Sequence, residues 1–199
     1  MGEYMRVLVI GSGGREAAIT YALNKSSKVD ELYCLPGNPG MGEIATLING
    51  SVEDLDFILK TVEDFNIDFT VIGPEVPLCM GLADLLESHG HKVFGPTKVA
   101  ATLEGSKAFS KDFMKRHNIP TAEYVEVDEY EKAVESLKRF KYPLVIKADG
   151  LAAGKGVVIC EDEEMALKTL KEFMLDGALN NAGSKLVIEE FLKGFECSL

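Results

Sequence analysis

Residues 144–159 read LVIKADGLAAGKGVVI, two apolar segments joined by a short glycine-rich loop. Aliphatic and β-branched residues before Lys147 and after Gly156 are typical of β-strands, and a short glycine-containing loop between two strands is typical of a hairpin. The spacing does not match a Walker phosphate-binding loop, because Gly156 stands where the Mg²⁺-binding hydroxyl residue should follow the lysine. We therefore predict a hairpin with glycines at its tip.

The predicted tip carries residues suited to binding phosphate. Gly150 and Gly154 have no Cβ, so backbone N–H groups can approach an anion closely. Lys147 and Lys155 flank the loop and can place ammonium groups beside phosphate oxygens. A surface hairpin with hydrated lysines fits the same pattern, and the residues alone leave both interpretations open.

A second glycine-rich segment lies near the start of the chain. The apolar run RVLVI (6–10) predicts a buried strand, and GSGGRE (11–16) leads into a segment with helical spacing. This order opens a doubly wound α/β domain, in which the helix N-terminus can bind an anion and Arg15 can clamp a phosphate. Glu16 replaces the third glycine of the dinucleotide fingerprint, and the second strand ends in PGN rather than in an acidic residue, so we exclude NAD binding. A tight turn without a ligand is the alternative.

Three glycine- or proline-rich loops follow three predicted strands in the first half of the chain. They are GSGGRE (11–16), PGNPG (36–40) and GPE (73–75). The carboxyl ends of parallel strands meet at one edge of a sheet, where ligands bind in open α/β folds. Glu75 can accept hydrogen bonds from an amine or a sugar hydroxyl there, or simply be hydrated. A single helix is expected from about Leu78 to Gly90.

The pattern changes near residues 95–96. A helix is predicted from Ser106 to His117 with Ser106 as its cap, and Lys107 in its first turn opposes the helix dipole, so we expect a compensating partner such as a phosphate. The capping-box pair Asp128 and Glu131 predicts the start of the next helix. The hairpin, a helix at 162–175 and a strand at 185–191 follow.

The composition restricts the possible partners. A net charge of −11 over 199 residues argues against a nucleic-acid or anionic-membrane surface. No apolar run reaches membrane-spanning length, no signal peptide is recognisable, and the cysteines and histidines lack metal-site spacing. Cys34 and Cys160 lie in strand-like runs, so we expect buried, reduced thiols and a cytoplasmic protein.

Eight segments together resemble one enzyme family. In chain order they are GSGGRE (11–16), PGNPG (36–40), GPEVPL (73–78), FGPT (94–97), LEGSKAFSKDFM (103–114), IPTAEY (119–124), VIKADGLAAGKGVV (145–158) and IEEFLKGFE (188–196). This ordered set closely resembles the phosphoribosylamine–glycine ligase (glycinamide ribonucleotide synthetase) family of the ATP-grasp superfamily. The resemblance covers nearly the whole chain.

The resemblance implies an α/β fold, with an N-terminal doubly wound parallel-sheet domain of the pre-ATP-grasp type (1–104) and the first, smaller α+β lobe of an ATP-grasp domain (105–199). It implies ATP-dependent ligation of glycine to 5-phosphoribosylamine, through glycyl phosphate, in de novo purine biosynthesis. The family continues for about as many residues again, with the second lobe and the Mg²⁺ or Mn²⁺ ligands. We therefore expect an N-terminal half with no metal ligand of its own and little activity alone.

The resemblance also assigns roles to residues. The two lysines that hold the ATP phosphates are Lys107 and Lys147, and Lys147 and Lys155 are the expected catalytic residues. The loop that closes over the phosphates and excludes water contains Asp149, Gly150, Gly154, Lys155 and Gly156. The adenine-binding segment contains Glu189, Phe191 and Leu192, and Glu196 is expected to bind the ribose hydroxyls. The phosphoribosylamine site is expected to contain Gly13, Gly14, Arg15, Glu16, Asn38 and Glu75.

One residue departs from the family pattern. The first motif of the family usually runs GGREHA, whereas this chain has Ala17 in place of the histidine, which weakens the expected first-domain site if that histidine touches substrate. Two other functions remain open: a nucleotide-binding module without catalysis, and another ATP-grasp carboxylate–amine ligase. The segments GPEVPL and GLAAGKGV argue against the latter.

Overall fold

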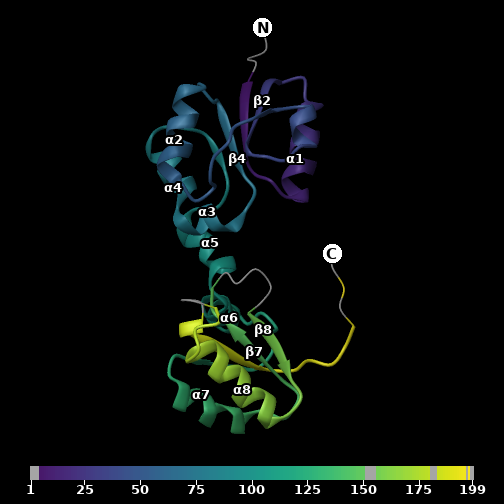
Figure 1. Cartoon of the computed structure of the whole chain (residues 1–199), viewed down its shortest axis with the longest axis vertical. Helices are drawn as coiled ribbons and strands as arrows, with labels where there is room; N and C mark the ends of the chain where they lie inside the picture. The colour runs from purple at the N-terminus through teal and green to yellow at the C-terminus, as the bar shows by residue number, and fades with distance from the viewer. Residues whose placement is uncertain (1–4, 151–155, 180–182, 196, 198–199) are drawn as a thin grey trace. The chain divides into compact units, whose positions relative to one another are not determined.

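The computed structural model describes residues 5–150, 156–179, 183–195 and 197. The chain forms two compact units, Met1–Ala101 and Thr102–Leu199, here called unit 1 and unit 2 (Figure 1). Helix α5 (Lys98–Gly105) contains the boundary. Each unit has its own hydrophobic core, so each is described separately.

Unit 1 is built on a five-stranded parallel sheet with the strand order β3-β2-β1-β4-β5. Its strands are β1 (Met5–Gly11), β2 (Val29–Pro36), β3 (Thr46–Leu47), β4 (Phe69–Ile72) and β5 (Val93–Phe94). Its helices are α1 (Gly14–Asn24), the short 3-10 helix η1 (Met41–Glu43), α2 (Leu55–Asp64), α3 (Glu75–Met80) and α4 (Leu82–Ser88). The predicted doubly wound parallel-sheet fold is confirmed.

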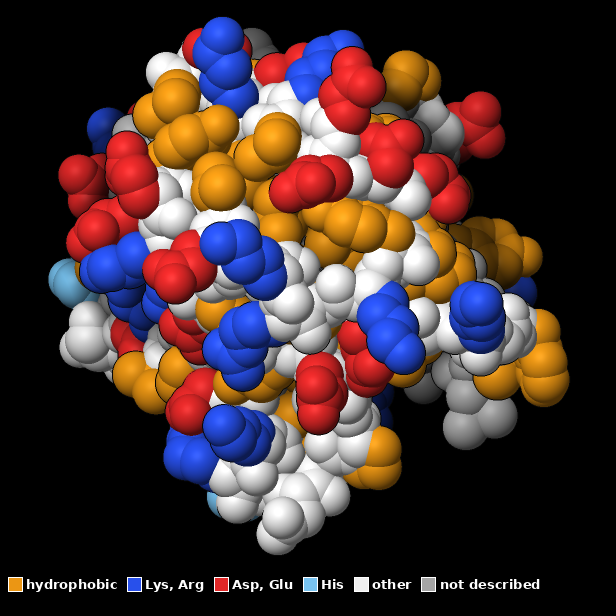
Figure 2. Space-filling view, turned by 90° about the horizontal axis from the view of Figure 1, so that it is seen from below, with side chains coloured by type: hydrophobic (Ala, Val, Ile, Leu, Met, Phe, Trp, Pro, Cys, Tyr) orange, Lys and Arg blue, Asp and Glu red, His pale blue; other side chains and the backbone are white. Residues whose placement is uncertain are grey.

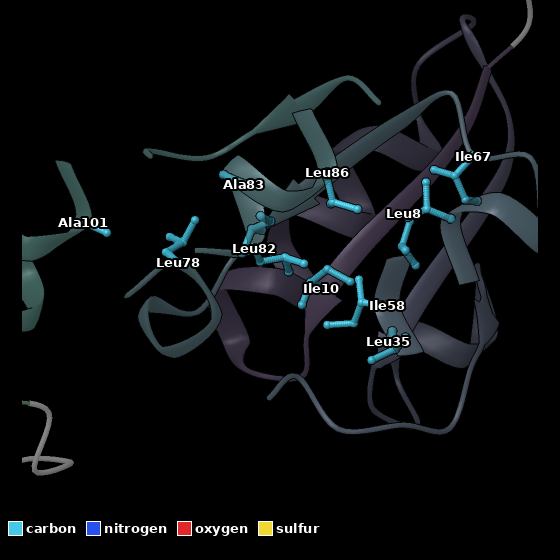
Figure 3. Packing of buried hydrophobic residues seen from close by; sticks show 12 residues of the cluster. Leu8, Ile10, Leu35, Ile58, Ile67, Leu78, Leu82, Ala83, Leu86 and Ala101 are labelled. Atoms are coloured by element: carbon cyan, nitrogen blue, oxygen red, sulfur yellow. The ribbon is translucent and has the colours of Figure 1, made fainter. Parts of the chain in front are cut away.

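The central strand β1 packs against helices on both faces of the sheet. Leu8 and Ile10 point into a cluster with residues of α2, α3 and α4 (Figure 3), whereas Val7 and Val9 belong to a second cluster with residues of α1. Alternation between two apolar faces explains why RVLVI is a continuous hydrophobic run. Figure 1 shows α1 on one side of the sheet and α2 and α4 on the other.

Unit 2 contains a four-stranded antiparallel sheet with the order β6-β9-β7-β8. Its strands are β6 (Tyr124–Val127), β7 (Leu144–Ala148), β8 (Val157–Cys160) and β9 (Leu186–Glu190). Its helices are α6 (Lys107–Arg116), α7 (Tyr130–Ser136), the 3-10 helix η2 (Leu137–Arg139) and α8 (Glu163–Met174). Figure 1 shows α7 and α8 together on one face of this sheet.

The two faces of the unit 2 sheet differ in character. Leu144, Ile146 and Ile188 face a core shared with α7 and α8. Lys147 and Glu189 alternate with these residues along β7 and β9 and therefore lie on the opposite face. The sequence pattern thus separates a packing face from a charged face within the same two strands.

Several predicted elements are confirmed. β7 and β8 form the expected antiparallel hairpin, in which Lys147 pairs with Val157. The N-caps Ser106 and Asp162 accept hydrogen bonds from backbone N–H groups of the first turns of α6 and α8. Cys34 and Cys160 are buried and free, as expected.

Two local predictions are wrong. The single helix expected from about Leu78 to Gly90 is instead α3 and α4, separated by Gly81 with φ of 102°. The expected capping box of Asp128 does not form, because α7 begins after Glu129, whose side chain makes no capping hydrogen bond. The two-residue strand β3 is too short to give a sequence signal.

The surface carries many charges of both signs. Figure 2 shows acidic and basic side chains next to one another on the face in view. Some pair within a helix, such as Lys132 with Glu129 at 2.7 Å and Lys168 with Glu172 at 3.9 Å. Within the described residues, no helix combines the length and apolarity needed to cross a membrane.

Candidate functional site

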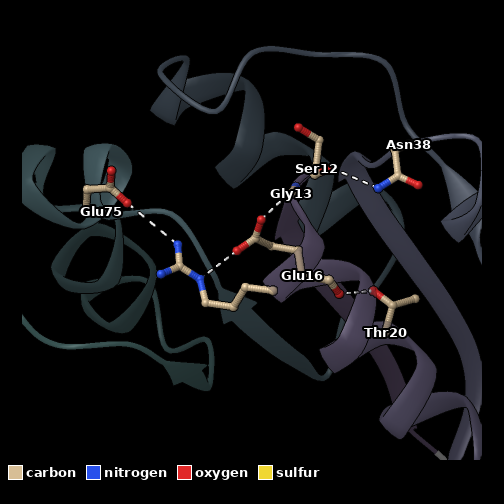
Figure 4. A network of polar contacts seen from close by, with 7 residues as sticks. Ser12, Gly13, Glu16, Thr20, Asn38 and Glu75 are labelled. Carbon is tan, nitrogen blue, oxygen red and sulfur yellow. Dashed lines mark hydrogen bonds and ion pairs between the residues drawn. The ribbon is translucent and has the colours of Figure 1, made fainter. Parts of the chain in front are cut away.

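The loops after β1, β2 and β4 lie at the carboxyl edge of the unit 1 sheet, where Glu16 occupies a central position (Figure 4). Glu16 is 4% exposed, and its carboxylate accepts hydrogen bonds from the Gly13 N–H at 2.7 Å and from Arg15 Nε at 2.9 Å. A Cβ on Gly11 or Gly73 would lie 2.6 or 2.3 Å from Glu16 Cγ. Glu16 therefore fills the space that both glycines leave, which explains why an acid fits where a dinucleotide-binding turn has glycine.

Arg15 and Glu75 are the exposed charged groups of this edge. Arg15 Nη2 lies 3.6 Å from Glu75 Oε2, and the side chains are 62% and 44% exposed. The hydrogen bond to Glu16 raises the pKa of the Arg15 guanidinium. Arg15 is thus a fixed cation between two carboxylates, and a phosphate bound there would compete with Glu75 for it.

Asn38 links two of the loops. Its Nδ2 donates to the Ser12 carbonyl at 2.8 Å, and its Oδ1 accepts from the Met41 N–H at 3.1 Å (Figure 4). Both polar atoms of the amide are therefore occupied within unit 1. The structure brings together the residues that were predicted at this edge: Gly13, Gly14, Arg15, Glu16, Asn38 and Glu75. Of these, Arg15 and Glu75 are best placed to meet a ligand.

In unit 2, Asp149 connects the end of β7 with the start of α6. Its carboxylate accepts hydrogen bonds from Ser106 Oγ and from the Ala108 N–H, each at 3.1 Å. Lys107 Nζ donates to the Gly150 carbonyl at 2.9 Å. A carboxylate at the helix N-terminus is favourable and offsets the cation in the first turn. Asp149 and the Gly150 carbonyl thus compensate the Lys107 cation from within the chain.

Lys147 is held on the charged face of the sheet by Glu189. Lys147 Nζ lies 3.0 Å from Glu189 Oε2, and Lys111 Nζ lies 2.9 Å from the same oxygen. Glu189 and Lys111 are buried, whereas the Lys147 side chain is 29% exposed. The ammonium of Lys147 can therefore reach a ligand, while its contact with the buried Glu189 carboxylate fixes its position.

Lys111 was not predicted from the sequence. Besides Glu189, it donates to Thr121 Oγ1 at 2.8 Å and to the Ala122 carbonyl at 3.4 Å. The available signal was its position one helical turn after Lys107, which places a second lysine near the same helix face. A lysine in an amphipathic helix is usually hydrated, so this signal alone does not indicate burial.

The remaining predicted residues are placed as follows. Gly156 is buried, and its carbonyl accepts from the Ala148 N–H at 2.7 Å. Phe191 follows β9 and lines a pocket of about 330 Å³ with Tyr142 and Pro143, and Leu192 is 63% exposed. Gly154, Lys155 and Glu196 lie outside the described residues.

A divalent metal ion is held by several side-chain ligands gathered at one place. Within residues 5–150, 156–179, 183–195 and 197, no three or more His, Cys, Asp and Glu side chains are grouped so that they could hold a metal ion. The Mg²⁺ or Mn²⁺ that the resemblance implies would therefore need ligands other than these residues.

Two family models match the chain. Residues 5–104 match the phosphoribosylglycinamide synthetase N domain, and residues 105–199 match its ATP-grasp (A) domain. The phosphoribosylamine–glycine ligase of Clostridium acetobutylicum is 48% identical over 195 residues, which are 98% of this chain and 47% of that protein.

Solved structures show the same fold. The phosphoribosylamine–glycine ligase of Thermotoga maritima superposes with a TM-score of 0.77 at 35% identity, covering 96% of this chain and 44% of that one. The biotin carboxylase domain of the Hydrogenobacter thermophilus 2-oxoglutarate carboxylase, solved with MgADP, gives a TM-score of 0.78 at 21% identity and shares the fold. The chain spans about half the length of the curated relatives that it matches. On these matches, the chain belongs to the phosphoribosylamine–glycine ligase family.

Proposed function

We propose that this chain provides the N-terminal half of an enzyme that joins glycine to 5-phosphoribosylamine and converts ATP to ADP and phosphate. The observation that carries the proposal is the placement of Lys147, an ammonium held at 3.0 Å by Glu189 at the base of the glycine-rich hairpin. Membership of the ligase family supports the choice of substrates.

The proposed reaction has two steps. A glycine carboxylate oxygen attacks the γ-phosphorus of ATP, and ADP leaves to give glycyl phosphate. The amine of phosphoribosylamine then attacks the glycyl carbon, a C–N bond forms, phosphate leaves, and the amine loses a proton. Such reactions depend on neutralising phosphate charge and on excluding water from the acyl phosphate.

We assign these tasks to residues of unit 2. Lys107 and Lys147 neutralise the phosphates, and the loop at 149–156, including Lys155, covers them. Residues 189–192 and Glu196 bind the nucleoside. A divalent cation would supply further charge neutralisation, and we propose that its ligands lie in the part of the longer enzyme that this chain does not contain.

We assign phosphoribosylamine to the sheet edge of unit 1. Arg15 offers a fixed guanidinium for its phosphate, and Glu75 offers acceptors for ribose hydroxyls or for the amine. In this assignment the substrate domain is 1–104 and the nucleotide-binding lobe is 105–199. Binding of glycine and phosphoribosylamine would distinguish this ligase from other ATP-grasp carboxylate–amine ligases.

The proposal is tested by measuring ATP affinity of the 199-residue chain by calorimetry, with and without Mg²⁺. Lys147→Ala should weaken ATP binding by about 1.5–3 kcal/mol, because a charge-assisted contact is lost. The matched control is Lys168→Ala on α8, which removes an exposed lysine (76% exposed) outside the site. Unchanged affinity in Lys147→Ala would contradict the assignment, whereas no ATP binding by the folded parent chain would mean that the cleft needs the other half of the enzyme.

A further inference from the structure

Three charged side chains from three different elements meet at one carboxylate oxygen in unit 2. Lys111 comes from α6, Glu189 from β9 and Lys147 from β7, and we call them the charge cluster. Both Nζ atoms contact Glu189 Oε2, at 2.9 Å from Lys111 and 3.0 Å from Lys147. Within the described part of the chain, the buried Glu189 Oε1 has no hydrogen-bond partner. A single oxygen therefore holds both cations.

The two lysines of the charge cluster differ in their access to a ligand. The Lys111 side chain is 8% exposed, and the Lys147 side chain is 29% exposed. Lys111 is fixed further by Thr121 Oγ1 and by the Tyr124 ring, whose centroid lies 5.6 Å from its Nζ. Lys111 is too enclosed to bind a phosphate directly, so any effect on a ligand must pass through Glu189.

The charge cluster carries a formal charge of +1, from two ammonium groups and one carboxylate. Without Lys111, Glu189 and Lys147 would form a neutral pair, and the carboxylate would attract Lys147 alone. With Lys111 present, the Glu189 charge is shared between two ammonium groups, and the cluster keeps a net positive charge beside the exposed Lys147. Because the carboxylate is buried and poorly screened, this difference in net charge should change the affinity for an anionic ligand.

We propose that Lys111 is a positioning residue for the nucleotide site: through Glu189 it keeps the charge cluster net positive and the Lys147 ammonium correctly placed for a polyphosphate. This inference rests on the proposed function, because it presumes that Lys147 binds ATP phosphates. Lys111 would thus help to determine nucleotide affinity without touching the nucleotide.

The experiment compares the ATP affinity of single and double variants at a temperature well below unfolding. Lys111→Met should weaken ATP binding roughly tenfold, and the same change in the Lys147→Ala background should have an effect of less than about twofold, because directly coupled groups are non-additive.

Two controls separate positioning from folding. Lys115→Met removes an exposed lysine from the same helix and should leave ATP affinity unchanged. Lys111→Arg keeps the charge and should bind ATP within about threefold of the parent chain. If Lys111→Met does not fold, Lys111→Gln, which can still donate to Glu189 or Thr121, makes the same charge change.

The outcomes are distinguishable. A purely structural role would lower the melting temperature without changing ATP affinity of the folded protein, or would weaken binding equally in both backgrounds, and either result overturns the inference. If the parent chain itself does not bind ATP, the premise that this lobe alone forms a nucleotide site fails, and this inference fails with it.

Discussion

Lys107 lies in the first turn of α6, where a cation opposes the helix dipole, and two contacts compensate for it. Asp149 places a carboxylate at the same helix end, and the Gly150 carbonyl accepts from the Lys107 ammonium at 2.9 Å. Both partners belong to the loop that follows β7. The contacts that compensate for this unfavourable lysine therefore also join the start of α6 to the root of the hairpin.

Gly73 offers a direct test of how Glu16 is packed. A Cβ at Gly73 would lie 2.3 Å from Glu16 Cγ and 2.4 Å from its Oε1, so Gly73→Ala must displace a buried carboxylate. We expect the free energy of unfolding of unit 1 to fall by about 1–3 kcal/mol, measured by denaturant titration. Gly14→Ala is the matched control, because a Cβ there meets nothing within 4 Å. Equal effects of the two changes would contradict this packing.

The buried thiols should make stability depend on pH. Burial raises the pKa of the Cys34 and Cys160 thiols. The unfolded chain releases these protons above about pH 8.5, whereas the folded chain retains them, so the free energy of unfolding should decrease as pH rises beyond that value. Denaturation of the parent chain and of Cys160→Ala at pH 7.5 and 9.5 checks this expectation, and an equal decrease in both would exclude a contribution from Cys160.

Among the secondary-structure elements, those with a strong local signal were predictable from the sequence. The hairpin of β7 and β8 follows from two apolar runs around glycines, and α8 follows from the Asp162 cap and helical spacing. The break between α3 and α4 was not predictable, because a glycine inside a helical pattern is often tolerated. Gly81 adopts its positive φ of 102° between α3 and α4, a conformation that no local pattern encodes.

The same contrast applies to the candidate site. Lys147 and Glu189 were predicted because each lies in a segment that resembles the family. Lys111 was missed because its burial depends on Thr121 and Glu189, which come from other parts of the chain. Whether a lysine is hydrated or forms a buried ion pair is decided by tertiary packing, not by the helix that carries it.

Gly81 should be sensitive to substitution because of its backbone conformation. Its φ is 102°, and a Cβ would lie 3.3 Å from the flexible Lys98 Cδ, so strain in the backbone rather than a clash is the main penalty. We expect Gly81→Ala to lower the free energy of unfolding by about 1–2 kcal/mol. Gly81→Asn should be less destabilising, because asparagine tolerates positive φ better than alanine does. Equal losses for both variants, measured by thermal unfolding, would contradict this explanation.

At the scale of the whole molecule, the chain combines two hydrophobic cores with a strongly acidic composition. The net charge of −11 is spread over a surface where both signs occur, as Figure 2 shows on one face. The charge cluster is a local exception, because Lys111 and Lys147 share the single carboxylate of Glu189. Local charge at the site therefore differs in sign from the charge of the molecule.

Separate cores predict separate responses to a local perturbation. Gly73→Ala acts on unit 1, so hydrogen exchange should become faster for the slowest amides of β1 and β4 and stay unchanged for those of β7 and β9. The comparison is made by mass spectrometry on the parent chain and the variant under the same conditions. Equal acceleration in both units would mean that they unfold as one cooperative body.

The root of the β7–β8 hairpin is held by two backbone hydrogen bonds, and they fix both ends of the loop between the strands. The Ala148 N–H and the Gly156 carbonyl are joined at 2.7 Å, and the Asp149 N–H donates to the Lys185 carbonyl at 2.8 Å. Both bonds lie at the base of the hairpin, and each doubling of the length of a loop closed in this way should cost about 0.6 kcal/mol of closure entropy. The hydrogen-bonded base therefore sets where the chain leaves β7 and where it returns to β8, whatever the length of the loop.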